Sequence, residues 1–485
     1  MKKAFLVFSL CLVLALAGLT AAVVLLHDSR DDVEVTLTTL TGDPAQAQGL
    51  TARQQARHSL HLLWDLTIPL DDPARAETSF SYHPWDLEWD PYQEAPLSLY
   101  TSESAVHYIE GTHTLPTEDL LGHDPAFSQL LPLLEEVAAQ TEPGQTHSET
   151  VRPGEYLPSH PYSVYSGLPN IILRYDETAS DHYDQEFLLP RFFQEAFPLA
   201  FSDEETWTVT VKKGETGYME EVGYDSTGPA GQIGLITDYN DQALYLALSQ
   251  DTWPQPDFGR FPQGNGVYRM DIVREGDEAY MEAQSLTNIY PLPDEAMVLD
   301  LTLDEEENLL VTWYDAGEYR CTILDGETMK PRETFHLFHQ ERSESEVIVC
   351  DNSSNEKYSY DTWSYVYLRA IPKEDFILFL GDNRFWFFLR TQEGWTEQFS
   401  APLSESLWYA SDLRMDAAWN GEKLAIASAD GWVSGLDLWI YDQAGELRYN
   451  GHYESSLTEY PDTEGYENRS DVVLMDGKEI MLDWQ

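Results

Sequence analysis

The chain has 485 residues, of which 42% are hydrophobic and 13% aromatic, and its 85 acidic residues against 28 basic ones give a formal net charge of −57 at pH 7. A chain of this length exceeds the usual size of a single hydrophobic core, so two domains or one large repeat architecture are expected. The negative charge repels phosphate backbones, which excludes nucleic acid as a partner, and it attracts cations and basic polypeptides.

The N-terminus predicts a membrane anchor. Lys2 and Lys3 precede an uncharged run from Ala4 to Leu26, which as a helix is long enough to cross a hydrocarbon core of roughly 30 Å. Positive charge before the span keeps that end in the cytoplasm. Residues 1–27 are therefore expected to be a cytoplasmic tip and a transmembrane signal-anchor. The result is a single-pass protein of the cell membrane whose C-terminal domain is extracytoplasmic.

The alternative is a cleaved signal peptide, because small residues before Ala17 and Ala22 offer two cleavage sites. That alternative gives a secreted protein. Residues 28–57 are polar and are expected to form a stalk. Residues 58–485 then make up an extracytoplasmic β-rich domain.

A helical insertion is expected near residues 124–140. Asp124 can cap the helix and Pro125 suits its first position. Apolar residues recur every three or four positions from Phe127 onward, which gives one buried face. Pro132 argues against a continuous helix and predicts a kink or a break.

The stretch from Leu413 to Tyr453 is typical of four short antiparallel strands. Asn420-Gly421 and Asp430-Gly431 lie between β-prone runs, and both dipeptides tolerate the positive φ of tight hairpin turns. Four strands in about 40 residues match one propeller blade. Similar sets of strands begin near residues 233, 297 and 365.

The end of the chain reads as half a blade. Val472–Met475 and Glu479–Trp484 are expected to form a hairpin, and Leu60–Leu70 is a candidate partner strand. Propellers commonly close their ring by completing one blade with strands from both chain ends. The fold expected is a mostly β, irregular β-propeller of six or seven blades. Paired β-sandwiches are the alternative, since the sets recur with no fixed period.

The layout resembles that of uncharacterised membrane-anchored exported proteins of Gram-positive bacteria. The likeness lies in the Lys-Lys apolar start, the run from Thr39 through Gly42-Asp43-Pro44, the phrase HLLWDLTIPL from His61, and the acidic propeller-like repeats. The resemblance implies a location and a fold. It carries no catalytic motif and therefore implies no activity.

Two groups of residues are candidates for binding. Asp238, Asn240 and Asp241 form a turn whose oxygens suit calcium, although an ordinary acidic hairpin turn is the alternative. No other cofactor is indicated. Aromatic rings beside carboxylates suit sugars or cationic peptides, although large rings also fill the gaps between blades. The tryptophans chosen as ligand-binding candidates are Trp363, Trp386, Trp395, Trp408 and Trp432.

Histidine and cysteine give weaker signals. His336 and His339 are three apart on an expected strand, so they are predicted to face opposite sides and not to share a metal. Cys321 and Cys350 are able to pair outside the cell, where disulfides persist. The sequence contains no recognised nucleophile, phosphate-loop or metalloprotease motif.

The function expected is that of a binding or sensor-type ectodomain for a peptide, a glycan or a protein. It is held at the membrane by its N-terminal helix and is not expected to be an enzyme. The alternative is an extracytoplasmic hydrolase or lyase on a propeller scaffold, since such sites assemble residues from distant blades.

Overall fold

The computed structural model divides into two compact units, residues 1–91 with 382–485 (unit 1) and residues 92–381 (unit 2). Most of its described residues lie in strands, and most of the strand pairs are antiparallel, which confirms the mostly β prediction. The described residues are 33–58, 62–82, 98–101, 125–157, 159, 162–165, 171–174, 192–193, 195–198, 201, 206–217, 219–226, 233–250, 261–275, 278–341, 343–350, 357–364, 368–381, 384–403, 414–429, 435–456, 472–474 and 480–484.

The apolar N-terminal run lies outside these residues. Within them, no helix combines the length and the apolar character that crossing a bilayer requires.

Unit 1 contains the four strands expected in the stretch from 413 to 453. The Asn420 turn joins the first two, because the side-chain oxygen of Asn420 accepts hydrogen bonds from the N–H groups of Glu422 and Lys423. The sheet order is β1-β29-β28-β27-β26. The strands of the predicted set are β26 (Arg414–Trp419), β27 (Lys423–Ala429), β28 (Gly435–Asp442) and β29 (Leu447–Ser455).

A fifth strand, β1 (Val35–Gly42), adds to the outer edge of this sheet by pairing with β29. It ends at Gly42, whose φ is +82° and where a Cβ would lie 2.0 Å from the carbonyl oxygen of Arg448, so only glycine fits. A stalk was predicted for residues 28–57. The structure instead places β1, the short 3-10 helix η1 (Pro44–Ala47) and strand β2 in residues 35–58.

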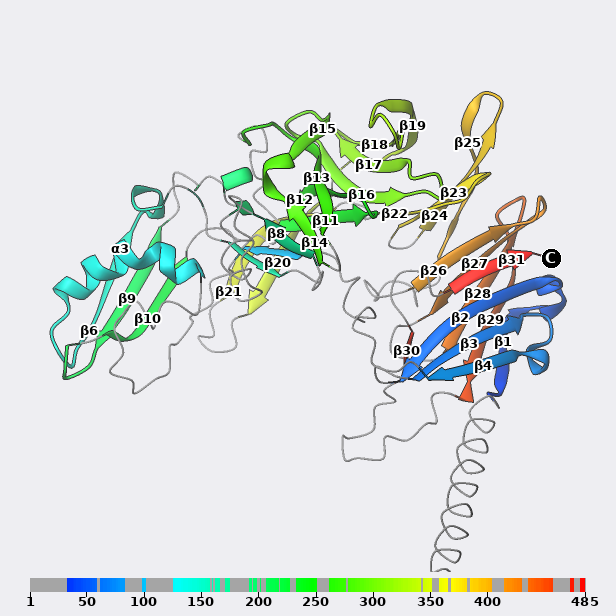
Figure 1. The fold of residues 1–485 in the computed structure, drawn as a ribbon, viewed down its shortest axis with the longest axis horizontal. Coiled ribbons are helices and arrows are strands. Elements are labelled where there is room, and N and C mark those ends of the chain that lie inside the picture. The colour runs from blue at the N-terminus through cyan, green and yellow to red at the C-terminus, as the bar shows by residue number, and fades with distance from the viewer. Residues whose placement is uncertain are drawn as a thin grey trace, which may run out of the picture. The chain divides into compact units, whose positions relative to one another are not determined.

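The strands from both ends of the chain share a second sheet in unit 1. Strand β2 pairs with β3 and with both C-terminal strands, so the two ends of the chain share one sheet as expected. The predicted partner, Leu60–Leu70, is wrong, because that segment forms β3, which pairs with β2 and β4 instead. The blue and red strands that lie together in Figure 1 show this joining. The members are β2 (Leu50–His58), β3 (Leu62–Pro69), β4 (Glu77–Tyr82), β30 (Val472–Leu474) and β31 (Ile480–Trp484), with the 3-10 turn η2 (Pro73–Arg75) between β3 and β4.

The predicted hairpin of 472–475 with 479–484 is wrong in its pairing. Val472 to Leu474 lie opposite His58 to Ala56, and Ile480 to Trp484 continue along β2 from Gln54 to Leu50. Both segments therefore run antiparallel to β2 and share one direction. The long strand β2 offers enough backbone donors and acceptors to pair with both in turn, whereas a hairpin would reverse the chain between them.

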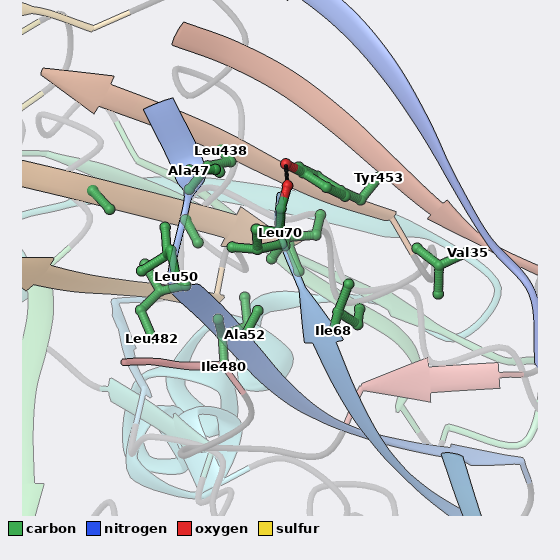
Figure 2. Close-up of a cluster of buried hydrophobic side chains, with 14 of the residues drawn as sticks. Val35, Ala47, Leu50, Ala52, Ile68, Leu70, Leu438, Tyr453, Ile480 and Leu482 are labelled. Atoms are coloured by element: carbon green, nitrogen blue, oxygen red, sulfur yellow. Dashed lines mark hydrogen bonds between the residues drawn. The ribbon is translucent and has the colours of Figure 1, made fainter. Parts of the chain in front are cut away.

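The two sheets of unit 1 enclose a common core (Figure 2). Alternate residues of β2 point into it, namely Leu50 and Ala52, together with Leu482 of β31. The Tyr453 hydroxyl donates a 2.6 Å hydrogen bond to the carbonyl of Leu70, which connects β29 to the end of β3. Unit 1 also contains the hairpin of β24 (Arg384–Thr391) and β25 (Gly394–Pro402).

Unit 2 contains two further sets of strands where the sequence predicted them (Figure 1). One is a four-stranded meander, β16 (Met297–Leu303), β17 (Leu309–Asp315), β18 (Glu318–Leu324) and β19 (Pro331–His339). The other set begins with β11 (Ile233–Tyr239), which pairs with β12 (Ala243–Gln250). Strand β12 then pairs with β13 (Gly266–Glu275). Strand β13 also pairs with β14 (Glu278–Glu282) and with β15 (Thr287–Pro291). The 3-10 turn η6 (Ala283–Ser285) joins β14 to β15, and β8 (Ile171–Arg174) runs parallel to β14.

Three further strand pairs lie in unit 2. One of them, β20 with β21, was not predicted from the sequence and lies between β19 and β22 in the chain. The pairs are β22 (Arg369–Pro372) with β23 (Phe376–Leu380), β20 (Ser343–Cys350) with β21 (Lys357–Ser364), and β5 (Ser98–Thr101) with β7 (Tyr162–Tyr165).

The helical insertion is present as α3 (Pro125–Gln140), which begins at Pro125 as expected and continues through Pro132 without a break. Its apolar face, including Leu134 and Val137, packs on a three-stranded sheet in the order β10-β9-β6. The strands are β6 (Thr146–Val151), β9 (Trp207–Lys213) and β10 (Met219–Ser226), with η3 (Pro153–Glu155) after β6.

Candidate functional site

Three aspartates, of which Asp416 is buried and Asp238 and Asp300 are half-buried, connect neighbouring sheets through hydrogen bonds from backbone N–H groups. In unit 2, Asp238 of β11 accepts from the N–H of Leu303 in β16 at 2.6 Å, and Asp300 of β16 accepts from the N–H of Ala370 in β22 at 2.7 Å. In unit 1, Asp416 of β26 accepts from the N–H of Leu482 in β31 at 2.7 Å. A carboxylate is a strong acceptor for a buried donor. Each aspartate therefore fixes the edge strand of one sheet to the next.

The environment of Asp300 changes the pKa of its carboxyl group. Burial raises its pKa from 3.8 to about 6, although hydrogen bonds from Ala370 and Thr302 act in the opposite direction. Asp300 was not among the site residues predicted from the sequence. The available signal was a single acidic residue inside the strand Met297–Leu303, whose other residues are apolar except Thr302.

The residues proposed for calcium are occupied by protein contacts. The two oxygens of Asp238 accept from the N–H groups of Tyr239 and Leu303. Asn240 accepts from the N–H groups of two residues in its own turn, and Asp241 forms an ion pair with Arg274 at 2.8 Å. Among the described residues, no group of three or more His, Cys, Asp or Glu is arranged to hold a metal ion. The calcium site stays a prediction.

The acidic turns of unit 2 are held together at one end of the sheets. The side-chain amide of Asn240 donates to Glu307 at 3.4 Å, which connects the β11–β12 turn to the β16–β17 turn. Asn308 accepts from the N–H of Gly326 in the β18–β19 turn at 3.2 Å. We name these three turns, residues 240–242, 304–308 and 325–330, the acidic rim.

The acidic rim is ordered by its own hydrogen bonds. Asp304 accepts from the N–H groups of Glu306 and Asn308, and Asp325 accepts from Thr328. Hydrogen bonds from Thr328 hold the pKa of Asp325 below its usual value. The carboxylates of Asp304 and Asp325 are therefore fixed to their turns.

The predicted tryptophans do not form one described surface. Trp386 is only 7% exposed, because both faces of β24 are buried around it. Trp395 in β25 lies near the guanidinium of Arg390, at 5.8 Å from the ring centre. The side chain of Trp363, and the whole of Trp408 and Trp432, lie outside the described residues. Trp386 fills the core, which is the alternative considered for these rings.

The prediction that His336 and His339 face opposite sides is wrong. Both contact one carboxylate, since Glu318 lies 2.8 Å from His336 Nε2 and 2.8 Å from His339 Nδ1. The register shifts between Tyr319 and Arg320, so that Leu337 is an extra residue opposite β18. A bulge of this kind reverses the alternation of side chains. The strand spacing alone therefore gave the wrong face.

Cys321 is a free thiol in the core of β18 and is not part of a disulfide. Burial raises its pKa well above the ordinary value, so it stays protonated and unreactive at neutral pH.

No family model and no curated protein matches this chain. Solved structures give faint likenesses. Puromycin hydrolase is 10% identical with a TM-score of 0.25, covering 84% of this chain and 55% of its own. The dihydro-heme d1 dehydrogenase NirN, in complex with DHE, is 11% identical with a TM-score of 0.24, covering 50% of this chain and 42% of its own. A protein from Lactobacillus plantarum is 10% identical with a TM-score of 0.21, covering 52% and 79%.

This chain therefore spans about half the length of the first two proteins. At such low TM-scores, neither fold nor activity carries over from any of the three.

Proposed function

We propose that the chain is a binding or sensor-type ectodomain built as an irregular β-propeller of six or seven blades. The observation that carries this proposal is the pattern of carboxylate links between successive sheets, Asp238 to Leu303 and Asp300 to Ala370 in unit 2 and Asp416 to Leu482 in unit 1. The pairing of β2 with β31 supports ring closure by the two chain ends. Propellers present their turns at the ends of the blades, where loops carry function.

The acidic rim is the surface that this proposal assigns to the ligand. Its turns carry Glu305, Glu306 and Glu307, and the chain as a whole has a net charge of −57. Such a field raises the local concentration of positively charged groups. The ligand class it favours is a basic peptide or a basic segment of a protein, and a glycan is the second class.

The N-terminal run from Ala4 to Leu26 gives the proposed location. A helix there would hold the ectodomain at the outer face of the cell membrane. A ligand would then be met outside the cell.

The test is a thermal-shift series on the chain from residue 28 onward. The ligands are a lysine-rich peptide, calcium, other divalent metals and cell-wall glycans. A ligand that binds only the folded state raises the melting temperature. When the free ligand concentration is a hundred times the dissociation constant, the free energy of unfolding increases by about 2.7 kcal/mol. A glutamate-rich peptide of equal length is the matched control. The triple variant Glu305→Gln, Glu306→Gln and Glu307→Gln should lose the response to the lysine-rich peptide.

Absence of a shift with every ligand would remove the binding proposal. The second candidate is an extracytoplasmic hydrolase or lyase. It would be favoured if the protein degraded wall glycans or peptides during the same incubations, since an enzyme needs acid and base groups that converge in one pocket.

A further inference from the structure

Strand β1 is the outermost strand of its sheet in unit 1. Among the described strands it pairs with β29 alone, and the strand order of the sheet ends at β1. Its residues from Thr38 to Gly42 are exposed, and Leu40, at 57%, is the most exposed large hydrophobic side chain of the described residues. An exposed edge strand offers backbone donors and acceptors to another extended chain.

The register shows which backbone groups are directed to that edge. The N–H of Ser456 donates to the carbonyl of Glu34 at 2.8 Å, so Glu34 and Ser456 form a hydrogen-bonded pair. In an antiparallel ladder, such pairs alternate with residues whose N–H and C=O groups point away from the partner strand. The unbroken register from Val35 to Thr39 therefore directs the backbone groups of Val35, Leu37 and Thr39 to the free edge.

The sequence of β1 lacks most of the features that keep edge strands from pairing with other chains. Its eight residues, VTLTTLTG, include no charged residue and no proline. Threonine and valine also favour the extended conformation. A bulge after Thr39 is the one protective feature, because it ends the regular register there. The available edge is therefore short, from Val35 to Thr39, which suits a peptide segment.

Carboxylates lie at both ends of this uncharged edge. Glu34 comes directly before β1 and Asp43 directly after it, and both are exposed. Glu454 of β29 is also exposed, whereas Arg448 of β29 is engaged in an ion pair with Asp442. A chain with a net charge of −57 repels a second copy of itself and attracts a cationic partner. The charges therefore favour a basic peptide over self-pairing.

We propose that the free edge of β1 binds an extended basic peptide segment, which adds to the sheet as a further strand. The peptide backbone pairs with Val35, Leu37 and Thr39, and its cationic side chains lie toward Glu34 and Asp43. In this mode of recognition, main-chain hydrogen bonds supply the affinity and side chains supply the specificity. The site uses no residue of the acidic rim, so it does not depend on the function proposed for the rim.

The experiment is hydrogen–deuterium exchange of the full chain in mild detergent, followed at segment 34–42 with a millimolar probe peptide. The probe alternates valine and threonine between two terminal lysines. Slowly exchanging amides should be gained, one for each of Val35, Leu37 and Thr39. The control peptide keeps the lysines but has prolines at its central positions, so it carries the same charge and cannot extend the sheet. It should give no added protection.

Variants of β1 test the edge directly. Thr39→Pro removes an N–H that points away from β29, and proline is tolerated at such positions of edge strands. The affinity for the probe, read from the concentration that gives half of the protection, should fall by about fivefold or more, since a hydrogen bond is lost and the ring blocks the incoming strand. Thr38→Ala is the matched control, because the backbone of Thr38 bonds to β29, and it should leave the affinity unchanged.

A second variant keeps the test decisive where Thr39→Pro does not fold. Glu34→Gln combined with Asp43→Asn removes the charges at both ends of the edge, and asparagine still caps η1 as Asp43 does through Ala45. Binding of the probe should weaken several-fold and depend less on salt. The triple glutamine variant of the acidic rim should keep the full protection of β1, which separates this site from the rim.

Two results overturn the proposal. The first is the absence of added protection with the probe, or equal protection with the proline peptide. The second is a chain that sediments as a dimer without any peptide and that Thr39→Pro converts to a monomer, because the edge would then be covered by a second copy.

Discussion

Single carboxylates decide how the sheets of this protein are joined. On an edge strand, the N–H groups that point away from the sheet have no partner within it, and leaving such a group buried without one costs about 1–3 kcal/mol. Asp238, Asp300 and Asp416 each supply the missing acceptor to a neighbouring strand. An aspartate suits this position because its short side chain loses little conformational entropy when the hydrogen bond fixes it.

Asp300 predicts a pH dependence of stability. Its pKa is about 6 in the folded state against an ordinary 3.8, so the folded chain binds more protons than the unfolded chain between these pH values. Its contribution to the free energy of unfolding is therefore greatest below about pH 4 and declines as the pH rises to about 6. The total decline is about 3 kcal/mol.

The variant Asp300→Asn should remove this decline, because an amide oxygen still accepts from Ala370 but does not ionise. Its stability relative to the wild type should rise between pH 4 and pH 7.5, measured by denaturant unfolding at several pH values. Asp241→Asn is the control, because Asp241 is 90% exposed in its ion pair with Arg274. Parallel pH profiles for wild type and Asp300→Asn would contradict the burial argument.

Two tyrosines of unit 1 give a matched pair. Tyr453 donates to the buried carbonyl of Leu70 at 2.6 Å, whereas Tyr441 donates to Pro402 at a longer 3.3 Å. Tyr453→Phe leaves that carbonyl unsatisfied and should lower the free energy of unfolding by about 1–3 kcal/mol. Tyr441→Phe should cost less. If both variants lose the same free energy of unfolding in equilibrium denaturation, the hydrogen bond to Leu70 contributes no more than the one to Pro402.

At the scale of elements, local signals predicted the strands well and the long-range pairings less well. The meander from 413 to 453 was predictable because its turns carry Asn420-Gly421 and Asp442, whose side chains set the chain reversal locally. The pairing of β30 and β31 with β2 depends on residues more than 400 positions away. No local pattern specifies such a register.

The candidate site was harder to predict from the sequence than the strands. The bulge at Leu337 places His336 and His339 on one face of the sheet. The alternation of side chains along a regular strand does not predict where such an extra residue is inserted. Trp386 was chosen as a ligand residue because aromatic rings suit sugars, yet its strand is buried on both faces. Burial of both faces of a strand depends on the other elements that pack against it, and the sequence of the strand alone does not predict those contacts.

Strand β31 allows a direct test of whether the C-terminal strand contributes to the hydrophobic core of unit 1. Leu482 points into the shared core and is 7% exposed, whereas its neighbour Met481 points outward and is 50% exposed. Leu482→Ala should cost about 2–5 kcal/mol of unfolding free energy, and Met481→Ala about 0.5 kcal/mol or less. Denaturant unfolding of both variants makes the comparison. Similar losses at the two positions would argue against β31 as the strand that seals this core.

At the scale of the whole molecule, the proposed membrane location would give separate roles to the acidic composition and to the apolar N-terminal run. A net charge of −57 is expected to repel anionic headgroups. An apolar segment from Ala4 to Leu26 would then supply the attachment that the surface itself resists. The proposed location follows from this division of roles.

Fusion of a reporter to the C-terminus tests that location. An alkaline phosphatase, which is active only after export, should be active and should sediment with the membrane fraction, because Lys2 and Lys3 hold the leader's first end inside. Replacing both lysines by glutamate should reduce export, and replacing Lys212 and Lys213 in the ectodomain is the control. An active reporter in the culture medium would indicate cleavage near Ala17 or Ala22, and an inactive one would contradict export altogether.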